Sequence, residues 1–210
     1  MFARLTSALP FLSRTKVDPS SFRSNMSTTS SAPAVATFGA GCFWGVEHIF
    51  LKHYPPAQNK GILKTSVGYT GGNIDNPTYR QVCSTDTGHA EALRVEFDPA
   101  VVSYKELVEF FFRTHDPRTF NQQGNDRGSQ YRSAVFTHSP EQAKIAEAVK
   151  ADVQAHHMAD YEKAYPLRGP NTIVTQIVEA GKWYDAEDYH QLYLFNNPSG
   201  YQCASHQLYW

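Results

Sequence analysis

The sequence predicts an α+β fold, in which a mixed β-sheet and a layer of helices make two layers. Three observations indicate this class. Strand and helix signals alternate from about residue 35 onward, one segment shows the two-residue period of a half-buried strand, and two segments carry helix-capping residues. The chain has 210 residues, enough for one domain of ordinary size. We therefore expect one structured domain over 34–210 that ends in an irregular tail.

The first thirty or so residues differ in composition from the rest. They include eight serines by Ser31 and five charged residues, namely Arg4, Arg14, Lys16, Arg23 and the single acid Asp18. A basic, Ser-rich and acid-poor segment is typical of a mitochondrial transit peptide and not of a secretory signal. We interpret residues 1–33 as a leader or, alternatively, a disordered tail. Met26 offers a second start, so we expect a mitochondrial location, a cytoplasmic one, or both.

Composition excludes several classes of function. Apolar residues make up 41% of the chain and its net charge is -1, which gives no electrostatic reason to bind nucleic acid or an anionic membrane. No apolar run reaches the roughly 20 residues that a spanning helix needs. Three cysteines are few and odd in number, which favours a reducing compartment over a disulfide framework. The thiols are therefore candidates for chemistry or for core packing.

The first half of the domain shows four elements in order. A short buried strand is expected over 34–38, a helix over 42–53 and a β-segment over 61–69. The fourth is the clearest, because Leu93, Val95 and Phe97 alternate with two charged residues as a half-buried strand requires. An Asp-Pro pair follows and ends this strand.

Two capped helices organise the second half. Ser103 and Glu106 form a capping box before a helix with an apolar face, and Ser139 followed by Pro140 opens another. We expect a strand over 132–137 between these helices, then a last strand over 173–179 and a short helix near 188–195. The remaining residues, rich in Asn, Pro, Gly and Ser, predict an irregular tail.

The densest local signal is Gly39-Ala40-Gly41-Cys42-Phe43-Trp44-Gly45, between the first strand and the first helix. A thiol at a helix N-terminus faces unpaired N–H groups and the positive end of the helix dipole, which favour the thiolate. Phe43 and Trp44 would form an apolar wall beside it. The alternatives are Cys42 as a small core residue and a dinucleotide-binding loop, but the glycine spacing and the bulky rings fit a phosphate site poorly.

Glu91 precedes the alternating strand, and the alternation places its carboxyl on the buried face. Burial raises the pKa of a carboxyl, so this group could donate a proton near neutral pH. An ion pair with Arg80, Arg94 or Arg132 is an equally open interpretation. His89-x-Glu91 also matches half of a zinc-deaminase signature, but its Pro-Cys-x-x-Cys half is absent from the sequence, and we expect no metal.

A series of motifs links these residues to a known family. They are Gly41-Cys42-Phe43-Trp44-Gly45, Gly68-Tyr69-x-Gly71-Gly72, Asn76-Pro77-Thr78-Tyr79, Gly88-His89-Ala90-Glu91, His115-Asp116-Pro117, Gln123-Gly124-Asn125-Asp126, Gly128-Ser129-Gln130-Tyr131-Arg132-Ser133, Tyr184-x-Ala186-Glu187-x-Tyr189-His190-Gln191 and Asn197-Pro198-x-Gly200-Tyr201. In this order and spacing, over about 38–203, the chain resembles the A type of peptide methionine sulfoxide reductase.

The resemblance implies a role for each matching residue. Cys42 would attack the sulfoxide sulfur, and Glu91 would protonate the departing oxygen. Tyr79 and Tyr131 would hydrogen-bond that oxygen, while Asp126 would hold the polar groups in place. Without the motifs, both tyrosines would be taken as ordinary surface residues.

The resemblance also implies a substrate and a cycle. Phe43 and Trp44 would cup the methyl group of methionine S-sulfoxide, free or protein-bound, so the enzyme would repair oxidised proteins. Attack would leave a sulfenic acid on Cys42, which Cys203 in the tail would convert to a disulfide for thioredoxin to reduce. Many members carry two tail cysteines and this chain has one; we interpret Cys83 as structural.

The family further implies a ferredoxin-like core, no bound metal or organic cofactor, and here a monomer. Two other functions remain as alternatives. An acyl transferase or hydrolase would need an imidazole beside Cys42, whereas His48 and His53 lie on its own helix. A non-catalytic module could instead bind oxidised or apolar side chains through Trp44.

Overall fold

The computed structural model describes residues 32–84, 87–166 and 170–210. Almost all of the expected leader, 1–33, lies outside these residues, as does Met26, so both interpretations stay predictions. Within the described residues no helix is long and apolar enough to cross a membrane.

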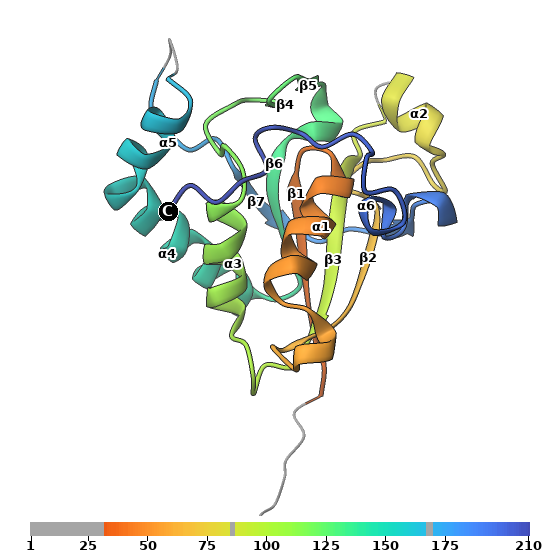
Figure 1. Cartoon of the computed structure of the whole chain (residues 1–210), viewed down its shortest axis with the longest axis horizontal. Helices are drawn as coiled ribbons and strands as arrows, with labels where there is room; N and C mark the ends of the chain where they lie inside the picture. Colours follow the sequence, from red (N-terminus) through yellow and green to blue (C-terminus); the bar gives the residue numbers. More distant parts are fainter. Residues whose placement is uncertain (1–31, 85–86, 167–169) are drawn as a thin grey trace, which may run out of the picture. The chain divides into compact units, whose positions relative to one another are not determined.

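A six-stranded mixed sheet forms the centre of the described part of the domain, in the order β7-β6-β1-β3-β2-β8 (Figure 1). Its strands are β1 (Ala34–Ala40), β2 (Ile62–Thr70), β3 (Ala90–Phe97), β6 (Ser133–Thr137), β7 (Gln176–Glu179) and β8 (Trp183–Asp185). β6 and β7 are parallel, and every other neighbouring pair is antiparallel. The predicted mixed sheet is confirmed.

Helices pack on this sheet. Figure 1 shows α1 (Phe43–His53) and α3 (Tyr104–Arg113) in front of the central strands, and α4 (Pro140–His156) packs beside α3. Three shorter helices, α2 (Tyr79–Ser84), α5 (Met158–Ala164) and α6 (Tyr193–Asn196), lie outside this layer, and β4 (Gln122–Gln123) pairs with β5 (Asp126–Arg127) in a separate ribbon. The predicted α+β class is confirmed.

The apolar core lies between the sheet and the helices. Phe38 of β1 is completely buried, and its ring centroid lies 5.5 Å from that of Phe50 on α1 and 5.1 Å from that of Phe111 on α3. Strand register places Leu93 beside Phe38 on one side and beside Val67 on the other. One layer of side chains therefore joins three strands to two helices.

Both predicted N-caps are confirmed. The Ser103 hydroxyl accepts a hydrogen bond from the Glu106 N–H, and the Ser139 hydroxyl accepts one from the Gln142 N–H. Each serine thus satisfies a backbone donor that the helix itself leaves unpaired.

The expected short helix over 188–195 is wrong as a continuous element. A 3₁₀ turn (Asp188–His190) and α6 replace it, with Leu192 between them in the left-handed region at φ +53°. The Leu192 N–H donates to Glu47 on α1, and Gln191 hydrogen-bonds through its side chain to both backbone groups of Val67. These distant contacts outweigh local helix formation.

Replacement of Phe38 by alanine is expected to destabilise the protein by about 3–5 kcal/mol, because it removes a buried ring from between two helices and leaves a cavity. Urea denaturation would measure the loss. Val101→Ala is the matched control, since Val101 is 56% exposed, and it should change the free energy of unfolding by less than about 0.5 kcal/mol. Equal losses in the two variants would contradict this account of the core.

Candidate active site

The turn from β1 into α1 places Cys42 at the N-cap, so the helix begins at Phe43, one residue later than the sequence predicts. Gly41 precedes it at φ +88°, a conformation that favours glycine. A Cβ on Gly41 would lie 2.6 Å from Cβ of Gln123, so this position also has no room for a side chain. The Cys42 side chain is held at the end of the sheet and is 8% exposed.

Glu91 lies under this turn. It is on β3, two residues from Leu93 and therefore on the same buried face, and it is 1% exposed. The Phe43 N–H, in the first turn of α1, donates to Glu91 Oε2 at 3.1 Å. Among the described residues no arginine forms an ion pair with Glu91; Arg132 donates to the carbonyls of Ser129 and Gly88. The buried-face prediction is thus correct, and the arginine alternative is wrong.

Burial controls the protonation of both groups. It raises the pKa of Glu91 to about 8; nearby Asp126 adds to the rise, and the Phe43 N–H opposes it. Burial also raises the pKa of Cys42, and the Glu91 carboxylate raises it further, against the N–H groups of Trp44 and Gly45. The helix N-terminus favours the thiolate as the sequence predicts, but desolvation outweighs this effect, so the net shift in pKa favours the thiol.

Tyr79 and Tyr131 come from different parts of the chain and face the same space. Tyr79 begins α2, and Tyr131 ends the 3₁₀ turn Ser129–Tyr131. Burial raises the pKa of each hydroxyl, and Glu91 and Cys42 add to both rises through electrostatic interaction. Cys83, which we interpret as structural, is exposed and interacts electrostatically with both hydroxyls.

Aromatic rings form the wall beside Cys42. Phe43 is almost fully buried, and Trp44 stacks on Tyr193 with ring centroids 3.8 Å apart. The Trp44 indole N–H donates to Nδ1 of His190 at 2.9 Å, so the proton of this neutral imidazole is on Nε2. The ring of Tyr79 lies 4.5 Å from that of His190. His190 therefore joins the tryptophan to one of the two tyrosines.

Glu187 fixes this wall from behind. Its carboxylate accepts hydrogen bonds of 2.9 Å from the Tyr69 hydroxyl and from the Tyr79 N–H. Neither Glu187 nor His190 was singled out from the sequence. Both lie within a motif used for the resemblance, but nothing local shows that they pack against elements more than a hundred residues away.

The tail brings a second thiol to this region. Cys203 is 3% exposed, and its thiol donates to the Gln123 carbonyl at 3.4 Å and lies 3.1 Å from the Ser205 hydroxyl. Asp126 accepts from the Tyr201 hydroxyl at 2.9 Å, and its second oxygen is buried without a partner among the described residues. The charge of Asp126 raises the pKa of Cys42 and of Cys203, so it lies near both thiols.

Four of the predicted site residues, Glu91, Asp126, Tyr79 and Tyr131, lie close enough to Cys42 to interact with it electrostatically. Cys203 interacts in the same way with Asp126. Within the described part of the chain, no group of three or more His, Cys, Asp or Glu side chains could hold a metal ion, and no histidine is among the groups that shift the pKa of Cys42. The fold and the site thus define a cysteine-based enzyme with a buried acid beside the thiol.

Comparison with known proteins specifies the class further. The family model of peptide methionine sulfoxide reductase matches residues 34–209. A "Probable peptide methionine sulfoxide reductase" of Schizosaccharomyces pombe is 57% identical over 176 residues, covering 84% of this chain and 96% of that protein. "Peptide methionine sulfoxide reductase MsrA" of Methanosarcina acetivorans is 52% identical over 159 residues, 76% of each chain. The chain belongs to the peptide methionine sulfoxide reductase family.

Solved structures of Mxr1 are similar to this chain in fold and in sequence. Reduced Mxr1 from Saccharomyces cerevisiae is 37% identical and matches with a TM-score of 0.72 over 92% of this chain and 95% of its own. Mxr1 in complex with Trx2 matches with a TM-score of 0.51 at 26% identity, over 92% and 94% of the two chains.

The charge on Glu91 should control the reactivity of Cys42. Above about pH 8 the wild-type carboxylate is ionised and disfavours the thiolate, so Glu91→Gln should lower the pKa of Cys42 and speed its alkylation by iodoacetamide roughly tenfold, which corresponds to about one pKa unit. Peptide mass spectrometry would follow Cys42 alone. Asp126→Asn should act in the same direction but less, because Asp126 raises this pKa less. Unchanged alkylation in Glu91→Gln above this pH would contradict the electrostatic coupling.

Proposed function

We propose that this protein reduces methionine S-sulfoxide, free or in proteins, to methionine, with Cys42 as the attacking thiol. The observation that carries the proposal is the buried pair of Cys42 and Glu91, in which one group can supply electrons and the other a proton. Family membership supports the reaction, and the resemblance supports the S epimer.

The first step balances between these two groups. The Glu91 proton moves to the sulfoxide oxygen, Cys42 sulfur attacks the sulfoxide sulfur, and the thiol proton returns to the Glu91 carboxylate. The attack forms a bond between the two sulfurs. That bond and the S–O bond of the substrate then break as the oxygen, with its proton, passes to the Cys42 sulfur. Cys42, oxidised by two electrons, is left as a sulfenic acid, and the sulfoxide, reduced by the same two electrons, leaves as a thioether. The raised pKa of Glu91 supports its role as the acid, because the oxygen leaves only when protonated.

The surrounding side chains orient the substrate. Tyr79 and Tyr131 donate hydrogen bonds to the oxygen while negative charge develops on it, and their shared electrostatic contact with Cys42 supports this role. Trp44, fixed by stacking on Tyr193, forms the apolar seat for the methyl group with Phe43 behind it. Asp126 holds the tail through Tyr201.

A second step restores the enzyme. The Cys203 thiol attacks the Cys42 sulfenic sulfur, and a disulfide and water form; a dithiol then reduces the disulfide. Two thiols supply both electrons, so the cycle needs no bound metal or organic cofactor. We infer that the dithiol is thioredoxin, and the complex of Mxr1 with Trx2 supports this inference.

The finer features of fold and location are also proposals. The order β6-β1-β3-β2, antiparallel throughout and with helices after β1 and β3, supports a ferredoxin-like core. The family match over 34–209 supports a catalytic domain at 34–210. The composition of residues 1–33 supports a mitochondrial leader, with Met26 as a cytoplasmic start.

Variants of the two cysteines should respond differently to the two electron donors. We expect Cys42→Ser to abolish turnover of a blocked methionine S-sulfoxide with either dithiothreitol or thioredoxin. Cys203→Ser should keep turnover with dithiothreitol, which reduces the sulfenic acid directly, and lose it with thioredoxin. Methionine release would be quantified by chromatography, with Cys83→Ser as the matched cysteine control. Turnover by Cys42→Ser would refute the proposed attack.

Methionine formation in a single turnover should depend on the proton of Glu91. Because the pKa of Glu91 is raised to about 8, the group is protonated below that pH, and the rate should fall as pH rises through it. Glu91→Gln should be slower by about 10²–10⁴-fold and show no such fall. Rapid-quench measurements across this pH range would test it. A wild-type rate that instead increases through pH 8 would show that thiol ionisation limits the step.

A further inference from the structure

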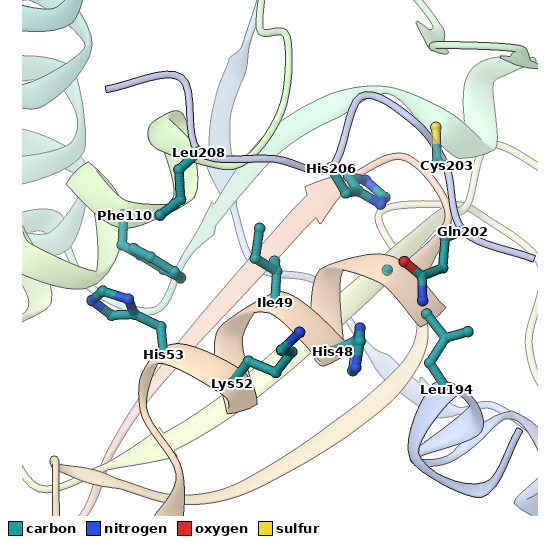
Figure 2. A pocket seen from close by; sticks show the side chains of 11 residues that line it. His48, Ile49, Lys52, His53, Phe110, Leu194, Gln202, Cys203, His206 and Leu208 are labelled. Carbon is teal, nitrogen blue, oxygen red and sulfur yellow. The ribbon is translucent and has the colours of Figure 1, made fainter. Parts of the chain in front are cut away.

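The tail crosses α1 next to the active-site turn. A cavity of about 280 Å³ lies between the tail and the helix, and its lining includes His48 and Lys52 of α1 and Cys203, His206 and Leu208 of the tail. Figure 2 shows the His206 ring between the tail and the start of α1, while the rest of the tail passes over the cavity. His206 therefore bridges a gap beside the turn that carries Cys42.

His206 is joined both to the tail and to the active-site turn. Its ring Nε2 donates to the Ala40 carbonyl at 2.7 Å, two residues before Cys42. Its backbone N–H donates to the Cys203 carbonyl at 3.0 Å and closes a turn that contains the second thiol. One residue thus links the backbone near one sulfur to the backbone at the other.

The helix provides a notch of the right size for this ring. A Cβ on Gly45 would lie 2.0 Å from Nδ1 of His206, and a Cβ on Gly41 would lie 3.5 Å from Nε2. Nδ1 is buried and has no hydrogen-bond partner within the described residues. Because burial lowers the pKa of His206, the ring is neutral, with Nε2 as its single donor. Glycine at position 45 leaves room for this ring, which among the described residues hydrogen-bonds to the Ala40 carbonyl.

The tail has further attachments on both sides of Cys203, and the nearest is the Tyr165 hydroxyl, which donates to the Ala204 carbonyl at 2.9 Å. Tyr201 bonds to Asp126 before the thiol, and after it the Tyr209 N–H donates to Arg113 while Trp210 stacks on His157. Between these attachments the Cys203 thiol hydrogen-bonds to a backbone carbonyl and to a hydroxyl. Both bonds are weak, because a thiol is a weak donor and a weak acceptor. The His206 ring is the tail's hydrogen bond to the turn that carries Cys42.

We propose that His206 is a positioning residue for the resolving step: its ring docks the Cys203 turn in the Gly41–Gly45 notch, so that Cys203 is held beside Cys42 when the sulfenic acid forms. The inference rests on the proposed function of these two cysteines. In that step the Cys203 thiol forms the sulfur–sulfur bond, the Cys42–oxygen bond breaks, and water leaves with the thiol proton. Holding the two sulfurs together raises their effective concentration.

Two variants test the notch from opposite sides. His206→Ala removes the ring, and Gly45→Ala leaves His206 in place but fills its seat with a residue that favours the helix. After one equivalent of methionine S-sulfoxide without reductant, His206→Ala should form methionine at the wild-type rate. For Gly45→Ala, whose backbone N–H acts on Cys42, the rate of disulfide formation is compared with that variant's own rate of methionine formation. Formation of the Cys42–Cys203 disulfide should slow at least tenfold, and dimedone should trap the Cys42 sulfenic acid, as read by mass spectrometry.

A conservative replacement and a neighbour provide controls. His206→Gln keeps an N–H that can reach the Ala40 carbonyl and should recover part of the disulfide rate, which a general loss of tail structure would not allow. Gln207→Ala changes an exposed tail residue and should behave as wild type. Urea denaturation of each variant would verify that the domain is folded.

The results distinguish failure of the His206 role from failure of the proposed catalytic cycle. Disulfide formation at the wild-type rate in both His206→Ala and Gly45→Ala would overturn the role of His206 alone. If the wild-type protein makes no methionine, or makes methionine without a Cys42–Cys203 disulfide, the proposed cycle fails and the role of His206 fails with it.

Discussion

The single hydrogen bond from the Phe43 N–H to Glu91 joins the sheet to the first turn of α1, and the site is arranged around it. A carboxyl beneath a helix N-terminus accepts a hydrogen bond from a backbone N–H. Among the described residues, however, this bond does not offset the cost of keeping the ionised carboxylate away from water. Glu91 therefore retains its proton near neutral pH, and its charge, when present, opposes ionisation of the neighbouring thiol. The turn before Cys42 requires glycine for a separate reason, because a side chain on Gly41 would meet Gln123.

A second set of contacts builds the opposite wall from the segment after β8. Buried Glu47 accepts a hydrogen bond from the Leu192 N–H. The Gln191 side chain hydrogen-bonds to the Val67 backbone in place of a neighbouring strand. Glu187 accepts hydrogen bonds from the Tyr69 hydroxyl and the Tyr79 N–H. Together they hold His190 against Trp44. In a regular helix the backbone groups hydrogen-bond to one another. In this irregular segment polar side chains supply those hydrogen bonds, and they thereby specify its conformation.

Patterns with a short range could be read from the sequence. The alternation through Leu93 correctly placed Glu91 on the buried face, and the serine caps of α3 and α4 were visible as local signals. The α+β class followed from the order of these elements. The three-residue strand β8 and the ribbon of β4 and β5 were missed, because such short segments exist only through their partners.

Properties that depend on distant groups could not be read in this way. The sequence shows that Cys42 begins a helix but not how deeply it is buried, so the sign of its pKa shift came out wrong. It shows Cys83 after the apolar Val82 but not that the fold leaves Cys83 exposed. The motifs identified most of the residues that meet at the site, whereas their contacts with Glu187 and His190 required the fold.

The two outer strands of the sheet are short, with four residues in β7 and three in β8. β8 covers only Gly68–Thr70 of β2, and the next position along that strand, Val67, is occupied by the Gln191 side chain. Long open edges invite pairing with extended segments of other chains. A protein whose family acts on oxidised, and hence often loosened, polypeptides meets such segments constantly. Because both outer strands are short and the position next to β8 is occupied, this sheet offers little open edge with which such segments could pair.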